Sequence, residues 1–359
     1  MQVGLVLEQC LAPVPGGTGR YSRELALALA RTAPSGSEVT GVTSFRRAPL
    51  RLDGVAVRRW PLPRRALVAS WERGGPPSVP GDVVHAPTPL HPRRRDTPLV
   101  VTVHDAVPWT YPETLTPRGV RWHRAMVGRA AATADLLVVP TQAVADELAR
   151  QLPLRDVLVV GEGVSADLGL PADADDRAAR LGLPERYLLT VATLEPRKGL
   201  RELVTALREV PGIPLLCVGQ AGWGGLSVPD LATAAGVDVR VLGRVPDADL
   251  AVLLDRATAL VVPSYDEGFG LPLLEGMAAG TPVLTSTAPA LMEVAAGAAL
   301  AVPLDGLVDG LRQITSDEQL RARLRVAGPE RAAGFAWDAA ASRLWLSYAD
   351  LHECDTRQA

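Results

Sequence analysis

Lysine is nearly absent from this chain of 359 residues. Of its 37 basic side chains, one is a lysine, Lys198, and all the others are arginines. The ammonium group of lysine is a compact point charge, whereas the guanidinium group of arginine is a planar fork of donors. A composition that otherwise relies on arginine therefore indicates that position 198 requires a compact charge.

Cysteines and long apolar runs are also scarce. Cys10, Cys217 and Cys354 lie far apart, which excludes a disulfide framework and a CxxC metal knuckle and is typical of a reducing cytoplasm. No stretch approaches the roughly 18 consecutive apolar residues of a membrane span. The first seven residues read as a strand and not as a signal peptide. We therefore expect a cytoplasmic protein, with peripheral contact at the inner face of the membrane as an option.

Several motifs that carry chemistry are missing as well. The sequence has no His/Cys cluster at metal-ligand spacing, no G-x-S-x-G elbow and no GxxxxGK[ST] phosphate loop. Its two D-x-D pairs, Asp173/Asp175 and Asp247/Asp249, are typical of a linker and of a helix cap. An aromatic and basic platform for nucleic acid is absent too. We expect no metal, no cofactor and no nucleic-acid partner.

The charge is divided unevenly between the two halves. Residues 1–165 contain 20 arginines and 14 acidic residues, a net charge of +6, and residues 166–359 contain 17 basic and 26 acidic residues, a net charge of −9. The basic half predicts a surface for an anionic acceptor or a lipid headgroup layer, or else an arginine-rich solvated face. One segment could touch a membrane-borne lipid acceptor or form an ordinary amphipathic helix. Its residues are Arg64, Arg65, Leu67, Val68 and Trp71.

Short apolar runs alternate with helical periodicity, which predicts an α/β fold with parallel sheets covered on both faces. The alternation is interrupted by a Gly-, Asp-, Ala- and Pro-rich hinge at residues 161–176 and then restarts. We therefore predict two Rossmann-like domains that face each other across a cleft. The predicted ranges are 1–165, 166–336 and a C-terminal helix at 337–359 that crosses back to the N-terminal domain.

The densest motif spans residues 264–277, Ser-Tyr-Asp-Glu-Gly-Phe-Gly-Leu-Pro-Leu-Leu-Glu-Gly-Met, directly after a predicted strand. Gly268 and Gly270 allow a ligand to approach the backbone, and the amides around Phe269–Leu271 open a helix, where an anion is stabilised. Glu267 and Glu275 flank this turn, and carboxylates accept hydrogen bonds from sugar hydroxyls. The alternative is a capped helix with two surface acids.

A second motif, Glu195-Pro196-Arg197-Lys198-Gly199, follows another predicted strand. Arg197 and Lys198 next to a helix start predict a cationic site for a diphosphate, and a solvated basic turn is the alternative.

Two weaker signals lie in the first half. A Gly-rich loop is expected at residues 13–19, where Gly16 and Gly17 could cradle a phosphate. His104 ends a buried apolar run, the position at which open α/β sheets place active residues.

Together these motifs resemble the retaining family-4 glycosyltransferases of the GT-B fold, in a form similar to bacterial mannosyltransferases. The resemblance covers nearly the whole chain and is carried by the E-x7-E element (Glu267, Glu275) and the Glu-Pro-Arg-Lys-Gly turn. The chain departs from the family at Thr193, where many members have Arg, and at residues 162–165, Glu-Gly-Val-Ser, where members often have Asn-Gly-Val-Asp.

The resemblance implies the function of each domain. The C-terminal domain would bind a nucleotide sugar, with Glu275 on the ribose, Glu267 on the transferred sugar, and Arg197 and Lys198 on the diphosphate. The N-terminal domain would bind the acceptor. The remaining implied contacts are Gly16 and Gly17 near the phosphate, His104 near the transferred sugar, and amides at Gly268, Phe269, Gly270 and Leu271 on the donor.

The expected activity is a metal-independent transfer of a hexose, with mannose from GDP-mannose favoured and a UDP-sugar possible, to a glycan or lipid-linked acceptor. The alternatives are a sugar-nucleotide 2-epimerase of the same fold and a non-catalytic nucleotide-sugar-binding protein. A two-domain dehydrogenase is disfavoured because the first loop lacks the dinucleotide fingerprint.

Overall fold

The computed structural model describes residues 1–93 and 96–358. Residues 94, 95 and 359, which the predicted domain ranges include, lie outside the described residues. The chain forms two compact units. The first contains Met1–Trp109, Arg118–Glu162 and the residues from Ala336 onward, and the second contains Thr110–Pro117 and Gly163–Phe335. The division thus falls after Glu162, and a short segment from the first half of the sequence belongs to the second unit.

The first unit is built on a seven-stranded sheet in the order β3-β2-β1-β4-β5-β6-β7, and every pair is parallel. Its strands are β1 (Gln2–Val6), β2 (Glu38–Thr43), β3 (Ala56–Arg59), β4 (Val83–Ala86), β5 (Leu99–Thr102), β6 (Leu136–Val139) and β7 (Val157–Val159). The central strands β4 and β5 are buried along their whole length, as strands covered on both faces are. The strand order reverses between β1 and β4, where such sheets place ligands.

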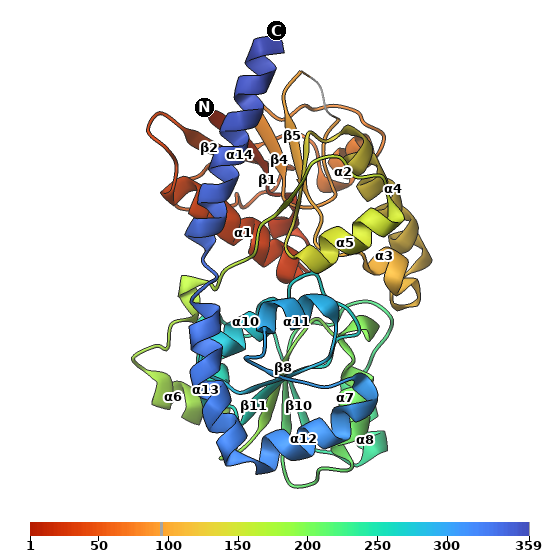
Figure 1. Cartoon of the computed structure of the whole chain (residues 1–359), viewed down its shortest axis with the longest axis vertical. Coiled ribbons are helices and arrows are strands. Elements are labelled where there is room, and N and C mark those ends of the chain that lie inside the picture. Colours follow the sequence, from red (N-terminus) through yellow and green to blue (C-terminus); the bar gives the residue numbers. More distant parts are fainter. Residues whose placement is uncertain (94–95, 359) are drawn as a thin grey trace. The chain divides into compact units, whose positions relative to one another are not determined.

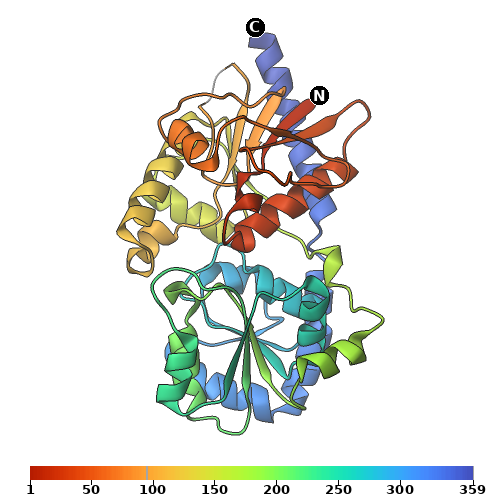
Figure 2. The ribbon, with the colours of Figure 1, turned by 180° about the vertical axis from the view of Figure 1, so that it is seen from behind.

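Helices cover this sheet (Figures 1 and 2). They are η1 (Glu8–Leu11), α1 (Gly16–Arg31), α2 (Arg64–Glu72), α3 (Val107–Thr110), α4 (Pro117–Thr133) and α5 (Gln142–Gln151). The short helix η2 (Pro112–Thr114), between α3 and α4, lies in the segment that belongs to the second unit. In α2 the apolar residues Leu67 and Trp71 are fully buried in the core. Leu67 and Trp71 therefore pack inside the protein, as in an ordinary amphipathic helix, and are not available for a membrane contact. A contact through the other residues of the segment stays a prediction.

The last helix, α14 (Trp337–Gln358), belongs to the first unit and packs on α1 (Figure 1). Trp345 Nε1 donates to the carbonyl oxygen of Leu29 at 3.1 Å, and Arg31 pairs with Asp338 at 2.6 Å. Tyr348, fully buried, bonds to His85 of β4. The C-terminal segment is thus anchored by packing and by polar contacts within this unit.

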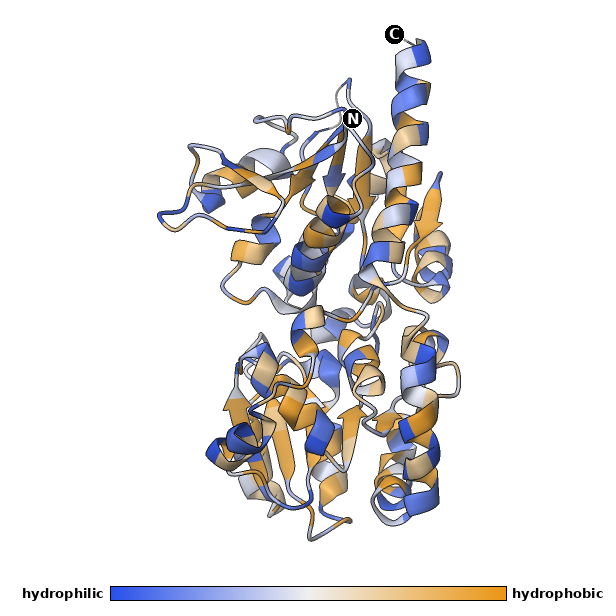
Figure 3. Cartoon of the chain, turned by 90° about the vertical axis from the view of Figure 1, so that its left-hand side faces the viewer, coloured by the Kyte–Doolittle hydropathy of each residue, from blue (hydrophilic) through white to orange (hydrophobic). Residues whose placement is uncertain are grey.

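The second unit has a six-stranded parallel sheet in the order β10-β9-β8-β11-β12-β13. Its strands are β8 (Leu188–Val191), β9 (Leu215–Val218), β10 (Val239–Gly243), β11 (Ala259–Val262), β12 (Val283–Thr285) and β13 (Leu300–Ala301). Figure 3 shows these strands among the most hydrophobic parts of the chain. The order reverses between β8 and β11, which makes the carboxyl ends of these two strands the expected ligand position.

The helices of the second unit lie on both sides of this sheet, α7 and α8 on one side and α13 on the other (Figures 1 and 2). They are η3 (Ala166–Leu168), α6 (Ala174–Leu181), η4 (Pro196–Lys198), α7 (Leu200–Leu207), α8 (Val228–Ala235), α9 (Asp247–Arg256), α10 (Leu271–Ala278), α11 (Pro289–Ala295), η5 (Leu304–Gly306), α12 (Leu307–Ser316) and α13 (Glu318–Ala332). The expected hinge at residues 161–176 therefore contains η3 and the start of α6.

The structure also tests what the sequence predicted for the Gly-rich stretch and for the cysteines. The Gly-rich loop expected at residues 13–19 is wrong in part, because α1 already begins at Gly16. Gly16 has a φ of 61°, a left-handed conformation that glycine adopts without strain and that turns the chain into the helix. The three cysteines are free, and Cys217 is buried in the core of the second unit.

Candidate functional site

Three loops meet at the carboxyl ends of β8, β9 and β11, and glycines allow their backbones to touch. A Cβ on Gly199 would lie 1.9 Å from the carbonyl oxygen of Pro263, and one on Gly219 would lie 1.8 Å from that of Ala192. Both glycines also have positive φ, of 63° and 151°. Any side chain at these two positions would push apart the loops that carry the charged residues.

The centre of this site is the carboxylate of Glu267, which three side chains contact. Lys198 Nζ donates to Oε1 at 2.6 Å, Ser264 Oγ donates to Oε1 at 2.7 Å, and Arg197 Nη1 donates to Oε2 at 2.9 Å. The structure therefore brings together Arg197, Lys198 and Glu267, which the sequence analysis placed in two separate motifs.

Burial and charge act against each other in this cluster. Burial by itself raises the pKa of the Glu267 carboxyl, but the charges of Lys198 and Arg197 and the hydrogen bonds from Lys198 and Ser264 outweigh it and lower this pKa to about 2. Burial raises the pKa of Glu195 above its ordinary value, although Arg197 and Lys198 oppose this. Glu267 is thus a permanent anion that compensates the two cations.

Arg197 and Lys198 are used differently. Arg197 binds Glu195 Oε1 through Nε and Nη2 at 3.2 and 3.0 Å, and its Nη1 also donates to the backbone oxygen of Asp266. Its guanidinium therefore clamps two loops together. Lys198 has three N–H groups, and within residues 1–93 and 96–358 Glu267 is the acceptor that the structure gives for them. Lys198 is the cation better suited to contact an anionic ligand.

The glycine-rich turn after Glu267 leads into α10, which begins at Leu271. Gly270 has a φ of 92°, and a Cβ there would lie 2.3 Å from Leu291 Cδ2. Helix geometry leaves the first backbone amides of α10 without partners in the helix, which favours an anion at this end. Phe269 is buried and packs edge-on against Phe335, with 5.5 Å between the ring centroids, so its side chain supports the turn.

Three of the other residues singled out in the sequence lie on helices. Glu275 is on α10 and is buried, 4% exposed. Gly268, which precedes Phe269, is also buried. Gly16 and Gly17 belong to the first unit, where they are exposed and form the first turn of α1.

His104 also belongs to the first unit and lies just beyond β5. Its Nε2 bonds to the carbonyl oxygen of Pro87 at 2.7 Å, and its Nδ1 lies 3.7 Å from Glu162 Oε1. The edge of one ring meets the face of the other between His104 and Tyr21, at 4.6 Å between centroids and 85° between planes. The carbonyl, the carboxylate and the ring together fix the orientation of the imidazole.

Sequence reasoning missed several residues of these sites. Glu195 and Ser264 lie within quoted motifs but were assigned no role, although both bond to the cluster. Asp266 was overlooked in the same way. Nothing in the sequence indicates that its backbone carbonyl oxygen lies beside Arg197. Glu162 was noted as a departure from the family pattern, and that departure places a carboxylate beside His104.

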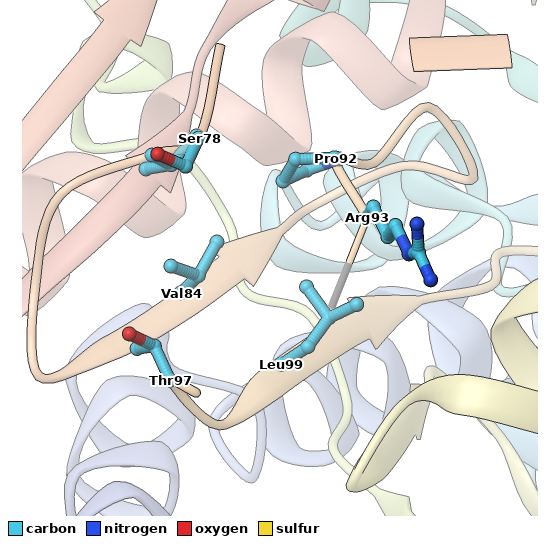
Figure 4. A pocket seen from close by; sticks show the side chains of 7 residues that line it. Ser78, Val84, Pro92, Arg93, Thr97 and Leu99 are labelled. Carbon is cyan, nitrogen blue, oxygen red and sulfur yellow. The ribbon is translucent and has the colours of Figure 1, made fainter. Parts of the chain in front are cut away.

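A small pocket of about 30 Å³ lies elsewhere, in the first unit, and is too small for a nucleotide. In Figure 4, Val84 and Leu99, which pair across β4 and β5, point into it. Among the described residues no group of three His, Cys, Asp or Glu side chains is arranged to hold a metal ion. None of the described helices combines the length and apolar composition needed to cross a bilayer.

Comparison with known proteins gives two family matches that together span most of the chain. Residues 15–168 match the profile "Glycosyltransferase Family 4", and residues 172–331 match "Glycosyl transferases group 1". The chain belongs to the retaining family-4 glycosyltransferases. The donors of this family are nucleotide sugars, and its members have the two parallel-sheet domains of the GT-B fold.

This glycosyltransferase is similar to the O-antigen chain mannosyltransferase B of Escherichia coli, with 29% identity over 71% of each chain. It is similar to the D-inositol 3-phosphate glycosyltransferase of Streptomyces avermitilis, with 35% identity over 59% of this chain and 51% of that protein. The matched region thus spans about half the length of the second relative. Among solved structures, HepE of Anabaena in complex with UDP-glucose has a TM-score of 0.72 and 20% identity, covering 98% of this chain and all of that one.

Proposed function

We propose that this glycosyltransferase moves mannose from GDP-mannose to a hydroxyl of a glycan or lipid-linked acceptor, with retention at the anomeric carbon and without a metal ion. The observation that carries the proposal is the cluster of Lys198, Arg197 and Glu267 at the β8/β11 reversal, where a nucleotide is expected. The similarity to a mannosyltransferase favours mannose. The similarity to a UDP-glucose complex makes a UDP-sugar the main competing donor.

In the second unit we assign each donor contact by its chemistry. Lys198, the amides of the turn at Gly268, Phe269 and Gly270, and the first amide of α10 at Leu271 face the diphosphate. Arg197 supports that charge while it holds the loops together. Glu267 accepts hydrogen bonds from the transferred sugar and Glu275 from the ribose, because carboxylates bind hydroxyls well.

In the first unit we keep the roles that the resemblance implies. Gly16 and Gly17 approach the phosphate, and His104 contacts the transferred sugar. The ring of His104 already has a fixed orientation through Pro87 and Tyr21, so it would lose little freedom on binding.

The reaction breaks the bond between the anomeric carbon and the phosphate oxygen, and the electron pair leaves with the diphosphate. The acceptor hydroxyl attacks from the same face, and its proton passes to the leaving phosphate oxygen. Negative charge therefore grows on the diphosphate as positive charge grows on the sugar ring. The preorganised ammonium of Lys198 and the amides of α10 stabilise the first charge, which is what fixed dipoles and cations do in an active site.

A panel of nucleotide sugars tests the donor assignment. Thermal shift measurements should show the largest stabilisation with GDP-mannose, because a ligand that binds the native state stabilises it according to its affinity. Addition of EDTA should leave turnover unchanged, and a strict requirement for Mg²⁺ would contradict the metal-independent scheme. Conversion of a nucleotide sugar to its epimer without acceptor would identify a 2-epimerase, and binding without any turnover over an acceptor panel would identify a silent binding protein.

A further inference from the structure

Residues Thr110–Pro117 belong to the second unit, although the residues before and after them in the sequence belong to the first. Thr110 of this segment contacts the loop after β11: its Oγ1 donates to Asp266 Oδ2 at 2.8 Å. Asp266 directly precedes Glu267, the acid at the centre of the cluster. A residue from the sequence region predicted to bind the acceptor therefore bonds to the loop that carries the donor residues.

Among the contacts of Asp266, those with Thr110, Glu267 and Arg197 hold this loop. Its Oδ2 is held by Thr110, its Oδ1 accepts the backbone N–H of Glu267 at 2.9 Å, and its backbone oxygen accepts Arg197 Nη1 at 2.8 Å. A rotation of the Asp266 side chain would release the backbone amide of Glu267 and loosen the loop that carries Glu267 and contacts Arg197. The Thr110 hydroxyl removes that freedom by binding the second carboxylate oxygen.

Two further contacts join the same segment to neighbouring loops. The ring of Tyr111 lies 5.8 Å from that of Tyr265, and Trp223 Nε1 donates to the carbonyl oxygen of Thr114 at 2.7 Å. Trp223 is on the glycine-rich loop after β9. We call residues 110–114 the donor strap, because they contact the loops after β9 and β11 together.

We propose that Asp266 is a positioning residue for the donor site and that the donor strap, through Thr110, holds it in place. The strap sets the affinity for the nucleoside diphosphate part of the donor, not for the acceptor. This inference deepens the proposed function and rests on it, because it requires Glu267 and Arg197 to hold the donor.

Binding of GDP and UDP to the full chain by calorimetry tests the proposal without any turnover. Thr110→Val removes the hydroxyl at nearly constant volume, and we expect the Kd of the diphosphate that the wild type binds to rise about tenfold, the loss of one hydrogen bond to a charged group. Thr110→Ser should restore it. The matched control is Thr205→Val, since the Thr205 hydroxyl bonds to the carbonyl of Arg201 in its own helix.

A double-mutant cycle identifies the partner of Thr110. If Thr110 acts through Asp266, Thr110→Val should have little further effect on diphosphate affinity in the Asp266→Ala background. Trp223→Phe provides an independent variant of the strap, which loses the bond to Thr114 and should also weaken diphosphate binding. In turnover assays the donor KM should rise in these variants while the acceptor KM stays constant.

The outcomes separate this inference from the proposed function. A wild-type chain that binds neither diphosphate overturns both. A wild type that binds one of them, with Thr110→Val equal to it, overturns the role of the strap alone. Additive effects of Thr110→Val and Asp266→Ala, or a rise in acceptor KM without a change in donor KM, would also overturn that role.

Discussion

The first unit contains a buried network of neutral hydrogen-bonding groups beside its sheet, whereas the candidate site of the second unit is a buried cluster of ionised groups. In the first unit, Tyr348 bonds to His85 at 2.6 Å, His85 to Thr102 at 2.8 Å, and Thr102 to Tyr21 at 3.2 Å. Burial lowers the pKa of His85 to about 3, so the imidazole is neutral, and the charge of His104 acts in the same direction.

In the second unit the buried groups keep their charges because opposite charges are close. Glu267 lies within 3 Å of two cations, and its pKa is about 2. A neutral network can link a helix and two strands at little desolvation cost, as Tyr348 does with His85 and Thr102. An ionic cluster costs more to bury, but it supplies a fixed field for a charged ligand. We therefore expect the first network to serve the fold and, under the proposed function, the second to serve the reaction.

Glu267→Gln tests the ionic cluster most severely. The substitution keeps the shape but leaves Lys198 and Arg197 without their shared anion, and we expect a loss of about 3–5 kcal/mol in unfolding free energy. Urea denaturation of the full chain measures it. Glu318→Gln is the control, because Glu318 pairs with Arg321 and Arg325 at an exposed site. Equal losses of unfolding free energy in the two variants would mean that the buried cluster contributes no more to stability than an exposed ion pair.

Lys198→Ala tests whether the cluster serves the reaction. Loss of a preorganised group facing the leaving charge should lower kcat about 10²–10³-fold, equivalent to about 3–4 kcal/mol. Lys198→Arg should recover only part of the rate, since the guanidinium is larger and planar. Steady-state rates with far-UV circular dichroism check both variants. A folded Lys198→Ala variant with the wild-type kcat would contradict the diphosphate role.

Tyr348→Phe tests the neutral network. It leaves a buried His85 nitrogen without its partner, and we expect a loss of about 1–3 kcal/mol in unfolding free energy. Diphosphate binding should not change, because no residue of this network is assigned a contact with the diphosphate. Chemical denaturation and calorimetry measure the two quantities. A loss of diphosphate affinity without a loss of stability would reverse the assignment of the two networks.

Acid should affect the two units over different pH ranges. The pKa of His85 is lowered to about 3 and that of His91 to about 4, in both cases mainly by burial, so the unfolded chain binds more protons than the folded one below about pH 6.5. Each histidine therefore contributes stability that is complete above pH 6.5 and is lost as the pH falls, by about 1.4 kcal/mol per pH unit. The lowered pKa of Glu267 has the same sign, but its contribution is lost only between about pH 4.5 and 2.

Hydrogen exchange tests this difference between the two units. The protection of peptides from each unit is measured between pH 7 and 5 and corrected for the intrinsic exchange rate. Protection should fall first in peptides of the first unit. In the variant His85→Gln the free energy of opening of the first unit should depend less steeply on pH. The slope should fall by the equivalent of about one proton, because the titrating group is removed. A fall that begins in the second unit would contradict the assignment.

The sequence was most informative where function depends on local chemistry. The single lysine and the Glu-Pro-Arg-Lys-Gly and E-x7-E motifs predicted Lys198, Arg197 and Glu267 as site residues. Such motifs can be recognised in a sequence because glycines and charged residues follow a predicted strand at a fixed spacing. The alternation of apolar strands and helices likewise predicted two parallel sheets. The start of α1 at Gly16 was missed because a glycine-rich stretch indicates a loop by composition, whereas Gly16 here begins the helix.

What the sequence determined by itself is the alternation of strands and helices, the order of the motifs and the charged residues within them, since each depends on neighbours only a few positions away. Tertiary structure decided that Glu267 compensates Arg197 and Lys198, that Thr110 reaches Asp266, and that Tyr348 bonds to His85. These contacts join residues separated by 69 to 263 positions. They depend on how parallel strands align their carboxyl ends and on where helices pack, which no local pattern specifies.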